Sequence, residues 1–107
     1  MTKLDDEQYL YLTTTGRKTG LPREIEIWFI RREGKFYIFA EHFHKTQWVK
    51  NLLQNDRVKV RVGEVESMAA ARVLDPERDR ALWEETQAAA REKYGWGDGL
   101  PVEIALD

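Results

Sequence analysis

The spacing of the strand-like segments is the feature that most limits how this chain can fold. Most neighbouring segments are separated by gaps too short for a crossover helix, so a sheet of parallel βαβ units is excluded and antiparallel hairpins remain. Alternating apolar residues and β-branched or aromatic runs predict strands at 8–15, 23–32, 36–40, 57–62, 65–74 and 102–106.

Two segments change to a helical period. Within residues 45–54, Trp48 and Leu52 are four positions apart, as are Val49 and Leu53, and Thr46 is the expected N-cap. A second helix is expected over 76–93, with its cap at Asp75-Pro76 and its end at the sequence GWGDGLP. The expected fold class is therefore α+β, mainly β: an antiparallel barrel of about six strands with two flanking helices.

Composition sets the class of protein. With 107 residues, 42% of them hydrophobic and 34% charged, the chain predicts a single globular domain over 1–107. There is no cysteine, which excludes disulfides, thiolate metal sites and thiol catalysis. The N-terminal sequence MTKLDDEQYL lacks the apolar segment of a signal peptide, and no apolar run approaches the ~18 residues of a membrane span, so a cytoplasmic location is expected.

The loop in TTTGRKTG gathers positive charge in a chain whose net charge is −2. Gly16 and Gly20 permit a tight turn whose amides form a concavity, and Arg17, Lys18 and Arg23 add charged donors for an anion. The spacing is neither GxxxxGK[ST] nor GxGxxG. A solvated hairpin tip is the alternative interpretation, and the residue types alone leave both open.

Three segments carry a resemblance to a known family. LTTTGRKTG followed by Pro and Arg, then WVKNLLQNDRVKV, and finally KYGWGDGLPVEIAL are similar to the signature segments of the deazaflavin-dependent nitroreductase family. The resemblance covers most of the chain from Leu10 onward. It implies a split β-barrel that uses coenzyme F420 to transfer a hydride to a small-molecule acceptor: a quinone, a nitroaromatic or an activated alkene. FMN is the alternative cofactor.

The resemblance also implies site residues. Tyr94, or solvent, would protonate the acceptor. The expected cofactor-binding residues are Thr15, Arg17, Lys18, Thr19, Arg23, His44, Trp48 and Asn51. The chain departs from the family at EHFHKTQ, where many members carry small residues before the tryptophan helix.

Other patterns have competing interpretations. His42 and His44 lie two positions apart beside Glu41, a weak metal signal, and no metal is expected. A basic stripe on 57–61 invites comparison with nucleic-acid-binding barrels, but the acidic residues of the chain favour a solvated face paired with glutamates, and no nucleic-acid partner is expected. A carrier that binds deazaflavin, flavin or an apolar acid without turnover is the alternative to an enzyme.

Trp28 and Ile30 are predicted to face away from the barrel interior. On a continuous strand they lie opposite Ile25, Ile27 and Phe29, so they need cover from a helix, a flat ligand or a second subunit. A homodimer that covers them is expected.

Overall fold

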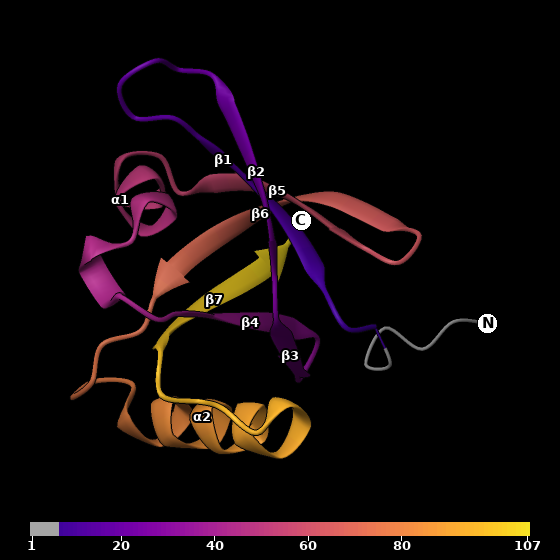
Figure 1. Ribbon diagram of the computed structural model, residues 1–107, viewed down its shortest axis with the longest axis vertical. Helices are drawn as coiled ribbons and strands as arrows, with labels where there is room; N and C mark the ends of the chain where they lie inside the picture. The colour runs from indigo at the N-terminus through magenta and orange to yellow at the C-terminus, as the bar shows by residue number, and fades with distance from the viewer. Residues whose placement is uncertain (1–6) are drawn as a thin grey trace.

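The structure is a computed structural model that describes residues 7–107; most of the N-terminal stretch compared above with a signal peptide lies outside this range. Seven strands form one sheet, flanked by two α-helices and a short 3-10 turn (Figure 1). The strands are β1 (Leu10–Thr15), β2 (Pro22–Ile27), β3 (Phe29–Arg32), β4 (Lys35–Ala40), β5 (Arg57–Val62), β6 (Val65–Val73) and β7 (Leu100–Leu106). The helical elements are η2 (Phe43–Lys45), α1 (Gln47–Gln54) and α2 (Arg80–Tyr94).

The sheet has the strand order β2-β1-β5-β6-β7-β4-β3, and every neighbouring pair is antiparallel. The antiparallel prediction is therefore confirmed. The two edge strands, β2 and β3, are consecutive in the chain, with only Trp28 between them. The sheet must curl so that its two edges meet at this residue, which gives the half-barrel of a split barrel.

The strand count corrects the prediction of about six strands. Residues 23–32 were expected to form one strand, but the chain bends at Trp28, and its two halves pair with different neighbours, β1 and β4. The alternation of apolar residues continues across the bend, so the sequence carries no sign of it. The interior is filled by side chains from most strands, including Leu10, Leu12, Phe29, Phe36, Ile38, Val58, Val60 and Ile104.

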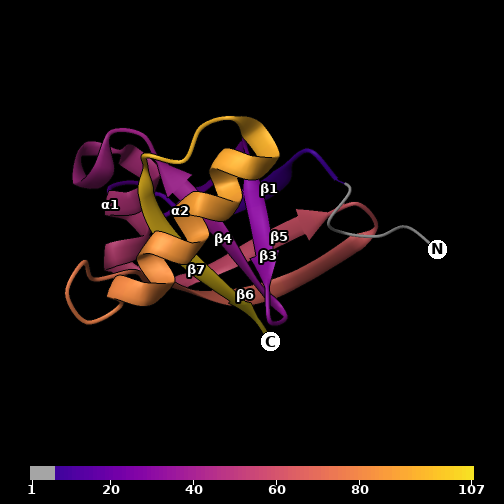
Figure 2. The same cartoon turned by 90° about the horizontal axis from the view of Figure 1, so that it is seen from below.

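Helix α2 lies across the face formed by β3, β4 and β7 (Figure 2). It buries a second apolar cluster, in which Ile30, Tyr37 and Phe39 pack against Ala90. Ile30 is only 4% exposed, so its cover comes from a helix of the same chain, and the prediction that a second subunit covers it loses its basis. Phe29 and Ile30 at the start of β3, and residues 36–40 of β4, are therefore buried on both faces of the sheet.

The start of α2 also differs from the prediction. Asp75 does accept hydrogen bonds from the backbone nitrogens of Glu77 and Arg78, as a cap would, but it closes a separate turn. The α-helix begins at Arg80, four residues after the predicted Pro76, with Asp79 as its N-cap residue. The Asp79 carboxylate is turned back to the Asp75 backbone nitrogen and to Arg72 rather than to the helix.

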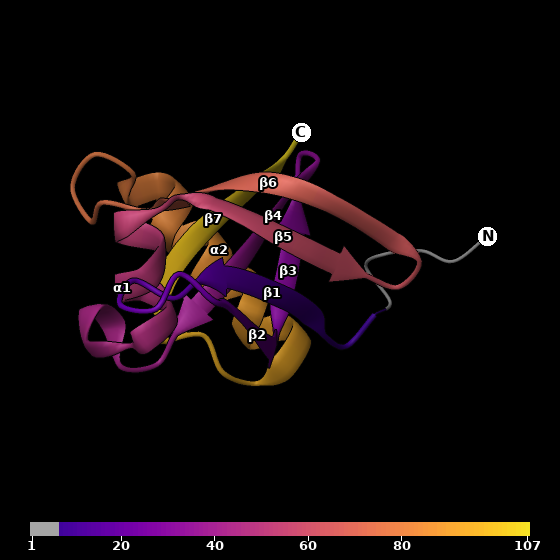
Figure 3. The same cartoon turned by 90° about the horizontal axis from the view of Figure 1, so that it is seen from above.

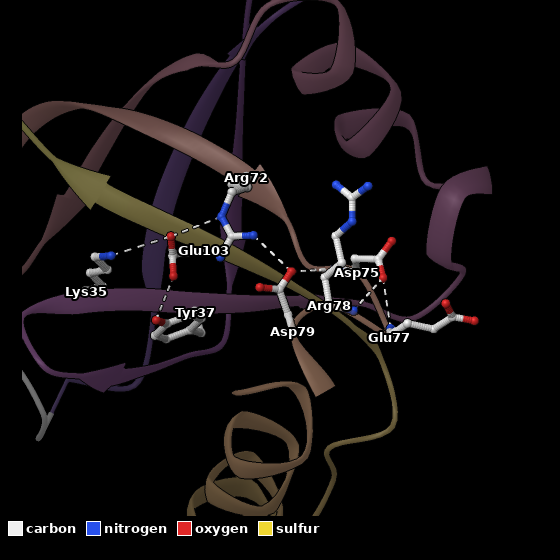
Figure 4. Close-up of polar contacts among 8 residues, drawn as sticks. All are labelled: Lys35, Tyr37, Arg72, Asp75, Glu77, Arg78, Asp79 and Glu103. Carbon is white, nitrogen blue, oxygen red and sulfur yellow. Dashed lines mark hydrogen bonds and ion pairs between the residues drawn. The ribbon is translucent and has the colours of Figure 1, made fainter. Parts of the chain in front are cut away.

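This turn belongs to a polar network that fastens α2 to the sheet (Figure 4). Arg72 on β6 bridges Asp79 and the almost fully buried Glu103 on β7. Glu103 also accepts a hydrogen bond from the Tyr37 hydroxyl at 2.9 Å and pairs with Lys35. Burial, and then the hydrogen bond to the Glu103 carboxylate, raise the pKa of Tyr37 well above its ordinary value.

Helix α1 packs beside the opposite end of the sheet, next to the β1–β2 hairpin (Figure 3). Thr46 occupies its N-cap position, as predicted, but its hydroxyl makes no capping hydrogen bond. Val49 and Leu52 are buried, whereas Leu53 is exposed. Within residues 7–107, neither helix is long and apolar enough to cross a membrane.

Candidate functional site: two adjoining pockets

The loop between β1 and β2 is a closed turn. The backbone nitrogen of Gly16 donates to the carbonyl of Leu21, and that of Gly20 donates to the carbonyl of Gly16, both at 2.8 Å. Gly20 has a φ of 74°, a conformation that favours glycine. At Gly16 a Cβ atom would lie 2.9 Å from the Thr19 hydroxyl and 3.1 Å from the Leu21 carbonyl oxygen, so the tight closure excludes a side chain there.

Arg17 is held from this loop onto helix α1. Its backbone nitrogen and its Nη1 both donate to the Asn51 side-chain oxygen, at 3.2 and 2.9 Å, and its Nη2 donates to Gln47 Oε1 at 2.7 Å. Asn51 is 6% exposed and donates in turn to the Thr14 hydroxyl at 3.2 Å. These partners are neutral, so the guanidinium is fixed in place while its charge stays available to an anion.

A basic pocket of about 390 Å³ opens beside this contact. Its lining residues are Thr14, Gly16, Arg17, Lys18, Thr19, Arg23, Ile25, Gln47, Trp48 and Asn51. Among the residues that the structure describes, no carboxylate lines this pocket and none forms an ion pair with its three cations. A compact pocket with several cations and amide or hydroxyl donors has the chemistry of an anion site.

A larger aromatic cleft, of about 670 Å³, adjoins the basic pocket. Its lining residues are Tyr9, Glu26, Ile27, Trp28, Phe39, Glu41, His42, Thr46, Trp48, Ala90, Tyr94 and Trp96. Trp48 lines both pockets, so the two are neighbours with one indole between them. Flat aromatic walls and few charges suit an extended ring system.

Trp28 and Tyr94 form one wall of the cleft. Their rings are stacked, with centroids 4.5 Å apart and planes 5° from parallel. The Tyr94 hydroxyl accepts a hydrogen bond from the Phe29 nitrogen at 3.1 Å, while the carbonyls of Phe29 and Gln8, each at 2.8 Å, are acceptors for its proton. Burial raises the pKa of Tyr94. The hydroxyl is thus held by backbone groups, and the ring is the part that faces the cleft.

The structure brings together most of the predicted cofactor residues. Arg17, Lys18, Thr19, Arg23, Trp48 and Asn51 all line the basic pocket. Thr15 does not; its hydroxyl lies near Asn55, and the buried Thr14 takes its place. The signal for Thr14 was in the sequence, because a strand alternates and Thr14 shares the face of Leu10 and Leu12.

The structure places the other histidine, His42 rather than His44, at the candidate site. His44, predicted to contact the ring, is exposed on η2 and lines neither pocket, whereas His42 lines the aromatic cleft. The intervening Phe43 has a φ of 50° and begins the 3-10 turn η2, so the two histidines do not lie on one extended strand. Within residues 7–107, no three His, Asp, Glu or Cys side chains come close enough together to hold a metal ion.

The basic stripe on β5 is a solvated face, as the charge pattern predicted. Lys59 pairs with Glu66 on the neighbouring strand, and Arg57 pairs with Asp107. Arg61 lies over the ring of Tyr11, 4.2 Å from its centroid. Each cation of the stripe is therefore engaged by a neighbouring strand or by the C-terminus.

Solved structures confirm the fold. The F420-H2 dependent reductase FDR-A matches with a TM-score of 0.65 and 26% identity, over 91% of this chain and 92% of that one. HutZ, the heme storage protein from Vibrio cholerae, matches with a TM-score of 0.78 and 17% identity, over 97% and 84%. An FAD-binding protein from Mesorhizobium loti matches with a TM-score of 0.77 and 13% identity, over 97% and 84%.

The curled antiparallel sheet, with an aromatic cleft beside a basic pocket, places this chain in the class of split β-barrel proteins. Within that class, the model of the F420H(2)-dependent quinone reductase family matches residues 1–107. The chain belongs to this family, and the resemblance noted from its sequence motifs is confirmed.

Proposed function

We propose that this protein is an F420H2-dependent oxidoreductase that reduces a quinone, a nitroaromatic or an activated alkene. The observation that carries the proposal is the basic pocket, in which three cations face a shared space and have no carboxylate partner among residues 7–107. F420 has a tail with a phosphate and several glutamates, and such a tail matches this pocket in charge. Family membership supports the same cofactor.

The basic pocket fits the tail in donor chemistry as well as in charge. Arg17 is preorganised by Asn51 and Gln47, so little side-chain freedom is lost when it binds an anion. Lys18 and Arg23 line the same pocket, and the Thr19 hydroxyl adds a further donor. The adjoining cleft offers Trp48 and the other aromatic residues to a flat ring.

Reduced F420, when bound, supplies a hydride from its deazaflavin ring. The chain's own contribution is to hold the cofactor tail, to orient the ring and the acceptor in one cleft, and to limit the access of water. The acceptor also needs a proton. The Tyr94 hydroxyl is engaged by three backbone groups, which favours solvent over Tyr94, the two proton sources expected from the sequence.

FMN is the alternative cofactor, and a non-catalytic carrier is the alternative function. Each has support from the fold, because HutZ is described as a heme storage protein and the Mesorhizobium loti relative as FAD-binding. FMN has a phosphate but lacks the string of glutamates, so it would use fewer of the cations of the basic pocket. The comparison of the two ligands therefore tests which one the pocket suits.

The test is a titration of the Arg17→Ala, Lys18→Ala double variant with F420 and with FMN, at low and high salt. Loss of charge-assisted hydrogen bonds is expected to weaken F420 binding by about tenfold to a hundredfold, or about 1.5–3 kcal/mol. The loss should shrink at high salt, because the pocket is partly open to solvent. FMN binding should fall less.

The matched control is Lys59→Ala, Arg61→Ala, which removes the same charge from the exposed stripe on β5. It should leave F420 affinity within about twofold, because these residues line neither pocket. Equal affinities for parent and loop variant, with the fold intact, would show that the loop is only a hairpin tip. Turnover is tested separately: the absorbance of reduced F420 should decay when menadione and the protein are both present, whereas a carrier would give no decay.

A further inference from the structure

Trp28 lines the cleft with a ring that is held in place. One face of this ring is covered by the parallel ring of Tyr94, and 36% of the residue remains exposed. Tyr94 cannot move away easily, because its hydroxyl is held by the backbone of Phe29 and Gln8. An aromatic ring fixed in this way can stack with a flat ligand without first losing much conformational freedom.

Trp28 lies at the end of the cleft that is remote from the basic pocket. Along β2, Arg23 and Ile25 line the basic pocket, whereas Ile27 and then Trp28 line the aromatic cleft. At about 3.3 Å per residue, Arg23 and Ile27 are separated by about 13 Å. Trp48, which lines both pockets, marks the near end. If the cofactor has its tail in the basic pocket, as proposed above, its ring adjoins Trp48 and the acceptor is left with the Trp28 end.

The charges of the cleft have the opposite sign to those of the basic pocket. Of the described residues that line it, Glu26 and Glu41 are acidic and none is Lys or Arg; His42 and two tyrosines are the other titratable groups. Glu26 accepts a hydrogen bond from the Tyr11 hydroxyl at 2.7 Å, which leaves its charge in place, and this contact raises the pKa of Tyr11. Glu41 is exposed and forms no ion pair within residues 7–107.

We propose that the Trp28 end of the cleft binds flat, uncharged or cationic electron acceptors and discriminates against anionic ones. Trp28 is the stacking surface, and Glu26 and Glu41 supply the discrimination, because a like charge near a carboxylate is repelled. The inference rests on the proposed function for its assignment of the two ends. It adds a substrate class within the acceptors considered there, and residues that select it.

The experiment compares menadione with 1,4-naphthoquinone-2-sulfonate, a neutral and an anionic quinone, as acceptors for F420H2. The measured quantity is the ratio of their kcat/KM values, so that variants are compared by a change in ratio and intrinsic reactivity cancels. Two variants remove negative charge from the cleft: the single variant Glu41→Gln, and the double variant that combines it with Glu26→Gln. Each should shift the ratio towards the anionic quinone by about threefold to tenfold at low salt, and less at high salt. Glu64→Gln, on the β5–β6 hairpin and outside both pockets, is the control and should not shift it.

The stacking role of Trp28 is tested by the KM of each quinone. Trp28→Leu should raise the KM of both quinones by about tenfold and leave their ratio unchanged, because loss of stacking does not depend on charge. Trp28→Phe keeps a flat ring, so its KM for both quinones should lie close to that of the parent protein. An unchanged KM in Trp28→Leu, or an unchanged ratio in the glutamine variants, would overturn the corresponding part of the inference.

A binding experiment without turnover distinguishes a failure of this inference from a failure of the proposed function. Equilibrium dialysis of both quinones against the cofactor-free protein needs no turnover, and the basic pocket is the same in the parent and in Glu41→Gln. If F420 neither binds nor reacts but Glu41→Gln still improves relative binding of the sulfonate, the proposed function fails and the charge selection stands. If F420 turnover occurs and no variant alters the ratio in either assay, the charge selection fails and the function stands.

Discussion

The side-chain oxygen of Asn51 accepts two hydrogen bonds from Arg17, one from its backbone nitrogen at 3.2 Å and one from its guanidinium at 2.9 Å. One buried amide on α1 therefore fixes both the path of the β1–β2 loop and the direction of its first cation. Because the same amide donates to Thr14, the sheet, the loop and the helix meet at a single side chain.

Asn51→Leu should lower the free energy of unfolding by about 1–3 kcal/mol, because it leaves buried or half-buried donors without their acceptor. It should also weaken F420 binding, since Arg17 is no longer held. Urea denaturation of the cofactor-free protein measures the first effect. Gln54→Leu, an exposed position on the same helix, should change stability by less than ~0.5 kcal/mol; equal losses in the two variants would contradict this role of Asn51.

Tyr94→Phe separates two roles for this residue. The variant keeps the ring against Trp28 but removes the hydroxyl from the Phe29 and Gln8 backbone, which should cost about 1–2 kcal/mol of stability. With solvent as the proton source, kcat should fall by less than about tenfold. A general acid would cost about a hundredfold to ten-thousandfold. Stopped-flow measurement of F420H2 oxidation, with the pH profile of kcat, decides between them.

Gly97 is a packing glycine. A Cβ atom there would lie 2.2 Å from the Gln87 carbonyl oxygen on α2, so Gly97→Ala should lower the free energy of unfolding by about 1–3 kcal/mol through overpacking. Gly95→Ala is the comparison: it has a φ of 79° and open space around it, so strain alone should cost about 1 kcal/mol. Thermal denaturation of both variants should show the larger loss for Gly97→Ala.

Stability should fall at alkaline pH through Tyr37. Its pKa is raised in the folded protein, so the folded state holds the phenol proton more tightly than the unfolded state. The contribution is complete below the unfolded value, near 10, and is lost as the pH rises above it. Tyr37→Phe should reduce this alkaline loss. Urea denaturation across a pH series measures it; an unchanged slope in the variant would assign the loss to other tyrosines.

The sequence predicted most of the fold because its strands alternate and its hairpins are short. It could not predict the bend at Trp28, since Ile27 and Phe29 continue the same alternation on both sides of it. The closure of the sheet divides the strand at this residue. The part before Trp28, β2, pairs with β1, and the part after it, β3, pairs with β4. The late start of α2 has a different cause: Arg72, near the end of β6 and seven residues before Asp79, binds the Asp79 side chain and stabilises the turn between the two elements.

The basic pocket was more predictable than the cleft. Residue types and spacing identified Arg17 and Lys18, because residues of one short loop are close in sequence and therefore also close in space. The cleft combines Tyr9, Glu41 and Trp96, which lie far apart in the chain and meet only through the sheet topology and the packing of α2. No local pattern marks Glu41 as a lining residue, whereas Thr14 could have been found from the alternation of β1.

The residues of the two pockets span different lengths of the chain, so the ribosome completes the two sets of residues at different times. Every residue that lines the basic pocket lies between Thr14 and Asn51, whereas the cleft also requires Ala90, Tyr94 and Trp96. During synthesis from the N-terminus, the ribosome has therefore produced all of the residues that line the basic pocket before it reaches the helix that completes the cleft. The β4–β7 pairing, which joins Ala40 to Leu100, forms across the longest loop of the sheet and is expected to be among the slow steps of folding.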